Sequence, residues 1–124
     1  MKILLVRPNP YEEAELSDFL RSHDCEVLTA TGQKAICQTL SEIRIDQVFY
    51  FTVSMDDFIL IRYINEHYPQ IKVVVISEER ICNAIENVRN GNFEAIRSPF
   101  HLSQLYKLID SQPTTNQIKH QSMK

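Results

Sequence analysis

The sequence lacks the features that mark several large classes of protein. The apolar run after Met1 is short and stops at Arg7-Pro8, so neither a signal peptide nor a membrane span is predicted there. Positive charge is not in excess, because 13 Lys and Arg stand against 16 Asp and Glu, which gives a formal net charge of −3. This balance predicts no direct nucleic-acid binding by the domain. We therefore expect a cytoplasmic chain without membrane contact.

Cysteine and histidine are too few and too scattered to predict a metal site. Cys25, Cys37 and Cys82 are an odd number at wide spacings, and they include no C-x-x-C pair. The four histidines fall on different predicted elements and form no catalytic pair with a serine or cysteine. We expect reduced thiols, no metal and no cofactor.

The sequence does contain a regular alternation of short β-rich runs with segments of helical period. The middle runs are almost continuously apolar, which is typical of parallel strands covered on both faces. The predicted strands span residues 3–6, 26–29, 47–52, 72–76 and 93–97.

Between these strands, apolar stripes and end signals predict five helices. Asn9-Pro10 offers an N-cap followed by proline at the first helical position, and Pro69 ends the third helix. Gly91 suits a left-handed C-cap of the fourth helix. Five βα units predict an α/β fold, a single flavodoxin-like (βα)5 doubly wound parallel sheet with strand order 2-1-3-4-5. We place this domain at residues 1–111 and a polar tail or linker at residues 112–124.

A ligand site in such a sheet lies beyond the carboxyl ends of the strands. No carboxylate occupies any predicted strand tip. The residues found after the first, third, fourth and fifth strands are Arg7, Pro8, Asn9, Phe51, Ser77, Ser98 and Pro99.

Over residues 2–109 the chain resembles the receiver domain of two-component response regulators. The segments that carry the resemblance are 1–6 (MKILLV), 46–51 (DQVFYF), 73–77 (VVVIS) and 91–100 (GNFEAIRSPF). The resemblance implies a site in which acidic residues after the first strand hold Mg²⁺. It also implies an Asp at the tip of the third strand that accepts a phosphoryl group, and a Lys before the proline of the fifth strand that pairs with the phosphate.

The chain departs from the receiver pattern at each of these positions. The acid pair falls on Arg7 and Pro8, or on Pro8 and Asn9 if the register is one residue later. The phosphoacceptor position falls on Phe51 and the Lys position on Ser98. Mg²⁺ needs hard oxygen ligands, and phosphoryl transfer to the protein needs a carboxylate nucleophile. Phe51 can supply neither, so we expect a degenerate phosphoacceptor pocket.

Other receiver features are kept only in part. Ser77 retains the family's Ser/Thr hydroxyl, whereas Ala95 takes the place of the aromatic switch, so the route from phosphorylation to the fourth and fifth strands is broken. Ser98-Pro99 matches a Lys-Pro that receivers hold in the cis form, and the sequence leaves the isomer open.

Two alternatives use other charged residues near the strand ends. Asp56 and Asp57 would make an unorthodox phosphoacceptor, although acids at this point also suit the N-cap and first turn of the third helix. Arg7 and Arg97 would form a small-anion site with neighbouring serine hydroxyls if they converge. Adjacent strand residues point to opposite faces, so the sequence leaves that convergence open.

Two surfaces are candidates for protein contact. Ile59 and Tyr63 lie one turn apart on the flank of the third helix that faces away from its core stripe. By resemblance, a second surface is the face of the fourth helix, fifth strand and fifth helix, which receivers use to dimerise. Its charges have both signs, which suits self-complementary pairing. They are Glu86, Arg89, Glu94, Arg97, Lys107 and Asp110.

Together, these features predict a non-enzymatic pseudo-receiver that acts independently of phosphorylation. It would act through protein–protein contact or dimerisation, as the N-terminal regulatory domain of a transcription regulator or another two-component-type protein. The expected partners are a second copy, another protein, or an output domain beyond the tail. A small-anion sensor and a receiver phosphorylated on Asp56 or Asp57 remain as alternatives.

Overall fold

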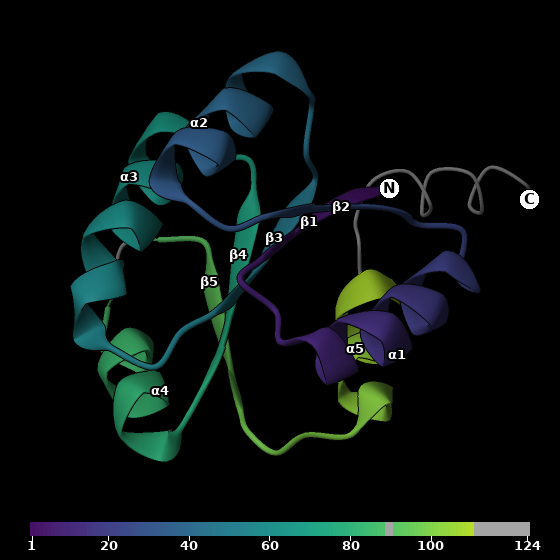
Figure 1. Cartoon of the computed structure of the whole chain (residues 1–124). Helices are drawn as coiled ribbons and strands as arrows, with labels where there is room; N and C mark the ends of the chain where they lie inside the picture. Colours follow the sequence, from purple (N-terminus) through teal and green to yellow (C-terminus); the bar gives the residue numbers. More distant parts are fainter. Residues whose placement is uncertain (89–90, 111–124) are drawn as a thin grey trace, which may run out of the picture.

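Five parallel strands form the centre of the computed structural model (Figure 1). Their order in the sheet is β2-β1-β3-β4-β5, which confirms the predicted order. Each strand begins and ends within one residue of its predicted bounds. The strands are β1 (Lys2–Val6), β2 (Glu26–Ala30), β3 (Gln47–Phe51), β4 (Lys72–Ser77) and β5 (Phe93–Arg97).

The structure describes residues 1–88 and 91–110, with only the backbone described for Asp110. The predicted interface residue Arg89 and the predicted tail at residues 112–124 lie outside the described residues. Within the described ranges, no helix has both the length and the apolar character that crossing a membrane requires.

Helices cover both faces of the sheet (Figure 1). α1 and α5 lie on one face, and α2, α3 and α4 lie on the other. A short 3₁₀ turn, η1, leads directly into α3. The bounds are α1 (Pro10–Arg21), α2 (Gln33–Glu42), η1 (Met55–Asp57), α3 (Phe58–His67), α4 (Glu79–Glu86) and α5 (Leu102–Asp110).

The sheet is buried on both faces because successive strand residues point to opposite sides. In β1, Ile3 and Leu5 pack in the cluster under α1 and α5, whereas Leu4 and Val6 pack in the cluster under α2, α3 and α4. All four side chains are fully buried. This two-sided burial explains the nearly continuous apolar runs in the sequence and leaves the strand ends as the place for polar chemistry.

Two of the predicted helix ends are confirmed. Asn9 is the N-cap of α1, and its Oδ1 accepts a hydrogen bond from the backbone N–H of Glu12 at 2.8 Å, with Pro10 as the first helical residue. α3 ends at His67, two residues before Pro69, as the proline predicts.

The predicted end of α4 is wrong. The helix ends at Glu86 with Asn87 at the C-cap, so Gly91 does not cap it. The backbone N–H groups of Asn87 and Val88 bond to the carbonyls three residues earlier, at 3.2 and 3.0 Å. This tightened last turn satisfies the terminal carbonyls before the chain reaches the glycine.

The cap of α1 can be tested by substitution. We expect Asn9→Ala to lower the free energy of unfolding by about 1 kcal/mol, because the N–H of Glu12 loses its acceptor. Asn9→Asp keeps an acceptor oxygen at the same place and serves as the control, with little expected change. Urea denaturation of the three proteins measures both values. Equal stability of Asn9→Ala and the parent chain would contradict the assigned cap.

Candidate functional site

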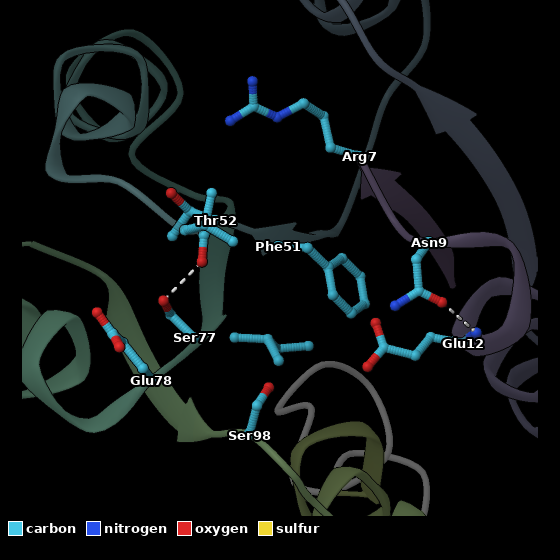
Figure 2. A pocket seen from close by; sticks show the side chains of 10 residues that line it. Arg7, Asn9, Glu12, Phe51, Thr52, Ser77, Glu78 and Ser98 are labelled. Atoms are coloured by element: carbon cyan, nitrogen blue, oxygen red, sulfur yellow. Dashed lines mark hydrogen bonds between the residues drawn. The ribbon is translucent and has the colours of Figure 1, made fainter.

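A cleft of about 670 Å³ lies at the carboxyl edge of the sheet (Figure 2). It brings together five of the seven residues predicted for the degenerate pocket, whereas Pro8 and Pro99 do not line it. The sequence had given no reason to single out the other five lining residues. The predicted lining residues are Arg7, Asn9, Phe51, Ser77 and Ser98, and the further ones are Glu12, Thr52, Val53, Ile76 and Glu78.

Phe51 places an aromatic ring at the position that the receiver resemblance assigns to the phosphoacceptor. It is the last residue of β3 and is only 9% exposed. It belongs to the apolar cluster that also contains Ile76 and Ile96, the next-to-last residues of β4 and β5. The tip of β3 therefore contributes apolar volume to the core and offers the cleft no oxygen ligand.

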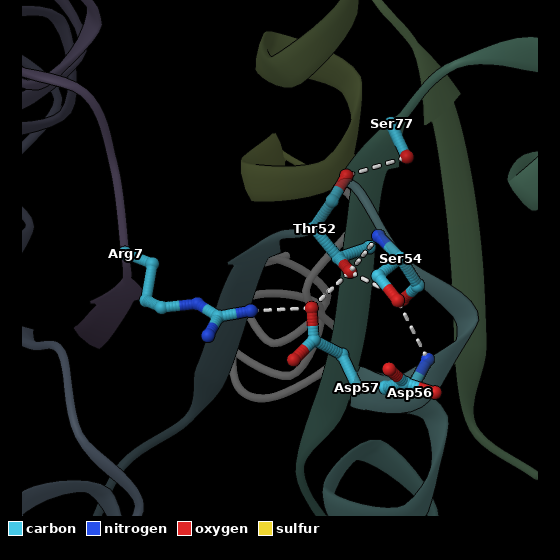
Figure 3. A network of polar contacts seen from close by, with 6 residues as sticks. All are labelled: Arg7, Thr52, Ser54, Asp56, Asp57 and Ser77. Carbon is cyan, nitrogen blue, oxygen red and sulfur yellow. Dashed lines mark hydrogen bonds and ion pairs between the residues drawn. The ribbon is translucent and has the colours of Figure 1, made fainter.

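The retained hydroxyl of Ser77 is already used within the protein. It donates a hydrogen bond to the carbonyl oxygen of Thr52 at 2.6 Å, and both residues are buried (Figure 3). The backbone N–H of Thr52 in turn donates to the carbonyl of Ile76 at 3.2 Å. These bonds fix the chain where it leaves β3, so Ser77 serves here to hold the loop after that strand.

An ion pair joins the loop after β1 to the start of α3 (Figure 3). The guanidinium Nη2 of Arg7 contacts the carboxylate Oδ2 of Asp57, and the hydroxyl of Thr52 donates to the same oxygen. The Asp57 side chain is 13% exposed and that of Arg7 is 39% exposed. Arg7 has a φ of 56°, in the left-handed region that non-glycine residues adopt mainly at special turns. A positive charge thus stands where the resemblance implies acidic metal ligands.

The predicted cap of the third helix is only partly correct. Ser54 Oγ accepts a hydrogen bond from the N–H of Asp56 at 3.0 Å, so Ser54 caps the η1 turn. Asp57 makes no capping bond with its side chain and uses its carboxylate for Arg7 and Thr52. Sequence reasoning missed this pairing because Arg7 lies fifty residues away in the chain.

Arg97 does not join Arg7 in an anion site. Its guanidinium donates to both carboxylate oxygens of Glu86 on α4, at 3.0 and 3.1 Å, and to Asn83 Oδ1. Hydrogen bonding from Arg97 lowers the pKa of Glu86 below its usual range. Arg97 does not line the cleft, and the charge of each arginine is matched by a carboxylate.

The donor set of the cleft does not suit a metal ion. Among the described residues, no group of three or more His, Cys, Asp or Glu side chains could hold one. The cleft contains only two carboxylates, those of Glu12 and Glu78, and the guanidinium of Arg7 borders it. The sequence left the isomer of the Ser98-Pro99 peptide bond undecided, and in the structure this bond is cis.

All three cysteines are free thiols, as expected. Cys25 and Cys82 are buried, and burial is the main cause that raises the pKa of each thiol. Cys37 is half-buried on α2. Raised pKa values favour the neutral thiol form, so Cys25 and Cys82 are not activated nucleophiles.

Four of the six exposed large apolar side chains in the described part of the chain gather around the start of α3. Ile59 and Tyr63, both predicted, are 80% and 36% exposed. Val53 and Met55 come from the connection between β3 and α3 and were missed because no helical period marks a loop. We call Val53, Met55, Ile59 and Tyr63 the α3 surface.

The face of α4, β5 and α5 is charged, but its ions largely pair within the chain. Arg97 bonds to Glu86, and Glu94 lies 3.9 Å from the Nζ of Lys72. Lys107 is exposed on α5. Of the other predicted members of this face, Arg89 is not described and only the backbone of Asp110 is.

Restoring a carboxylate at the tip of β3 should not restore an acceptor site. We expect Phe51→Asp to lower the free energy of unfolding by about 3 kcal/mol, because it removes a buried ring and places a charge against apolar neighbours. We expect no phosphoryl incorporation from acetyl phosphate and Mg²⁺, measured by intact mass. Phe51→Leu keeps the apolar character and should lose less stability. A phosphorylated Phe51→Asp chain would contradict the assignment of a site lost as a whole.

The Arg7–Asp57 pair should contribute measurably to stability. We expect Arg7→Ala to cost about 1–2 kcal/mol, because it leaves a mostly buried carboxylate without its cation. A double-mutant cycle with Asp57→Asn should give a coupling energy of about 1 kcal/mol.

The matched control cycle uses the exposed i,i+4 pair of Arg62 and Glu66, whose side chains are both 58% exposed. Its coupling should be only about 0.3 kcal/mol. Equal coupling in the two cycles would show that the pair at the strand ends is no more than a surface contact.

Comparisons with known proteins bear on the fold. No protein-family model and no curated protein matches the chain. A response regulator from Thermotoga maritima matches with a TM-score of 0.73 and 22% identity, over 92% of this chain and 98% of that one. A response regulator receiver domain protein from Bacillus halodurans matches with a TM-score of 0.74 and 20% identity, over 93% of this chain and 98% of that one.

A longer protein also matches. NtrX from Brucella abortus gives a TM-score of 0.76 at 22% identity over 98% of this chain, which spans only 28% of the NtrX chain. The part of this chain that these structures match includes all five parallel strands, in the order β2-β1-β3-β4-β5, with helices on both faces of the sheet. The chain therefore has the flavodoxin-like fold of response-regulator receiver domains.

Proposed function

We propose that this chain is a receiver-like signalling module that acts by protein–protein contact and without phosphorylation. The observation that carries the proposal is the state of the strand ends, where Phe51 fills the acceptor position and Arg7 is paired with Asp57. A receiver switches because a new charge appears in its site and rearranges its surroundings. Here Phe51 occupies the acceptor position and Arg7 is already paired with Asp57, so on this proposal neither a phosphoryl group nor a metal takes part in signalling. On this proposal the chain is not an enzyme.

The α3 surface is the proposed contact region for a protein partner or a second copy. Its members are exposed apolar side chains that follow one another from the loop after β3 to the second turn of α3. Clustered apolar side chains mark interaction sites far better than single ones do. The alternative face of α4, β5 and α5 is less suited, because Arg97 and Glu94 would have to leave their partners on the same chain.

The proposal extends to the setting of the domain in a larger protein. The match covers only 28% of the NtrX chain, so in NtrX the matching fold is one part of a longer protein. We propose by analogy that this domain is the N-terminal regulatory part of a transcription regulator or other two-component-type protein, and passes its signal to an output domain.

The alternatives have less support. An acceptor at Asp57 would have to release both Arg7 and Thr52, whereas Asp56 is exposed at the η1 turn and has no cation beside it among the described residues. A small-anion site in the cleft would rely on Arg7 alone, because Arg97 bonds to α4.

Independence from phosphorylation is tested with a phosphoryl analogue. We expect Mg²⁺ with beryllofluoride to leave both the thermal midpoint and the mass from light scattering unchanged, because no carboxylate is placed to bind the analogue. A receiver that carries the acid pair and the acceptor Asp serves as the positive control. A shift in this chain that Asp56→Asn or Asp57→Asn abolishes would instead establish an unorthodox acceptor.

Self-association through the α3 surface is tested by the same light-scattering measurement over a range of concentrations. We expect Tyr63→Ser to weaken dimerisation about tenfold, since loss of a buried aromatic contact costs more than 1 kcal/mol. Tyr106→Ser is the matched control, because each tyrosine packs against a histidine ring on its own face, His67 and His23 respectively. An equal effect of the two substitutions would remove the α3 surface from the proposal, and a mass that stays monomeric would restrict it to other proteins.

A further inference from the structure

A second cavity, of about 470 Å³, lies between α2 and α3. Among its lining residues, only Arg7 also lines the cleft described above. Its apolar walls include Ile36 from α2 and Leu60 from α3, with Ile59 and Tyr63 toward the outside. The volume is in the range of small-molecule sites in proteins.

The cavity is lined by a hydrogen-bond donor that the described protein does not use. Tyr50 lines the cavity and is as a whole only 1% exposed, and its hydroxyl makes no hydrogen bond with the described residues. Burial and, second to it, the charge of Asp57 raise the pKa of Tyr50 to about 12, so the phenol keeps its proton near neutral pH. A ligand oxygen in the cavity can accept a hydrogen bond from this hydroxyl, a role that no described residue fills.

The N-terminus of α2 adds further donors. Its N-cap is Gly32, which has no side chain to accept from the first-turn N–H groups, and that turn contains no acidic residue. Thr31 and Gln33, on either side of the cap, both line the cavity. Free N–H groups and the helix dipole favour an acceptor atom at this point.

The charge of the cavity limits what kind of acceptor fits. Arg7 is neutralised by Asp57, and Asp56 also lines the cavity, so two carboxylates stand against one guanidinium. An anionic ligand would be repelled by the carboxylate in excess. A cationic ligand would offer no acceptor atom to the Tyr50 phenol or to the N–H groups of α2. A neutral oxygen on an apolar body meets both conditions.

We propose that the cavity between α2 and α3 binds a small uncharged molecule with a flat apolar body and a carbonyl-type oxygen. The oxygen accepts a hydrogen bond from the Tyr50 hydroxyl, and the flat body lies between Ile36 and Leu60. This site does not depend on the proposed signalling function, because it requires only the geometry of the cavity.

The test uses three one-ring probes of matched shape, namely neutral benzamide, anionic benzoate and cationic benzamidine. In a titration followed by amide chemical shifts, we expect saturable shifts with benzamide at the start of α2 and in α3, and at least fivefold weaker binding of both charged probes. Absence of saturable shifts with benzamide, or equal or tighter binding of benzoate or benzamidine, would overturn the proposal.

Two substitutions test the role of the phenol. We expect Tyr50→Phe to weaken benzamide binding about fivefold, the effect of one lost hydrogen bond. Its thermal midpoint should not fall, because the hydroxyl has no partner within the described protein. Tyr106→Phe removes a hydroxyl outside the cavity and should change nothing. Unchanged binding by a folded Tyr50→Phe chain would contradict the assigned donor.

Cys37 provides an independent readout in the unmodified chain. It lines the cavity and is half-buried, whereas Cys25 and Cys82 are buried elsewhere. At a benzamide concentration ten times its dissociation constant, alkylation of Cys37 by iodoacetamide should slow about tenfold, as the fraction of empty sites dictates. An unchanged rate would show that benzamide binds outside the cavity.

Discussion

Burial of the parallel sheet on both faces is the constraint on which the remaining structure depends. Interior strand residues such as Leu4, Leu5, Val74 and Val75 are fully buried, so polar chemistry is displaced to the carboxyl edge. Side chains from the ends of β3 and β4 and from the loops after β1 and β5 meet at that edge, where the cleft and the α2–α3 cavity lie. Arg7 borders both of them.

The edge is held by contacts within the chain. The pair of Arg7 and Asp57 bridges the loop after β1 and the start of α3, and the bonds of Thr52 to Asp57 and Ser77 tie β4 into the same network (Figure 3). A receiver of the resembling kind would bridge these segments through carboxylates, a metal and a phosphoryl group. Here a guanidinium supplies the positive charge permanently, and the ring of Phe51 fills the acceptor position with apolar volume. This arrangement is the physical basis for the proposed independence from phosphorylation.

The same network connects the strand ends to the proposed contact region. Met55 belongs to the α3 surface and to the η1 turn that carries Asp57, so the ion pair helps to set where that surface stands. Ile59 and Tyr63 are shared between the α3 surface and the outer part of the α2–α3 cavity. The site, the cavity and the surface therefore share residues, whereas on the face of α4, β5 and α5 Arg97 pairs with Glu86, and Glu94 pairs with Lys72 of β4.

The sequence by itself determined the elements, their order and the residue types at the strand tips, because period-2 and period-3.6 patterns, caps and prolines act over a few neighbouring residues. Three results came only from the tertiary structure: the pairing of Arg7 with Asp57, the place of Tyr50 in the wall of a cavity, and the early end of α4. Each depends on segments that packing brings together from distant parts of the chain, or on a backbone geometry such as the left-handed φ of Arg7. No local pattern encodes such contacts, which is why the sequence predicts for Asp57 a place in the cap or first turn of a helix but not its pairing with an arginine fifty residues away.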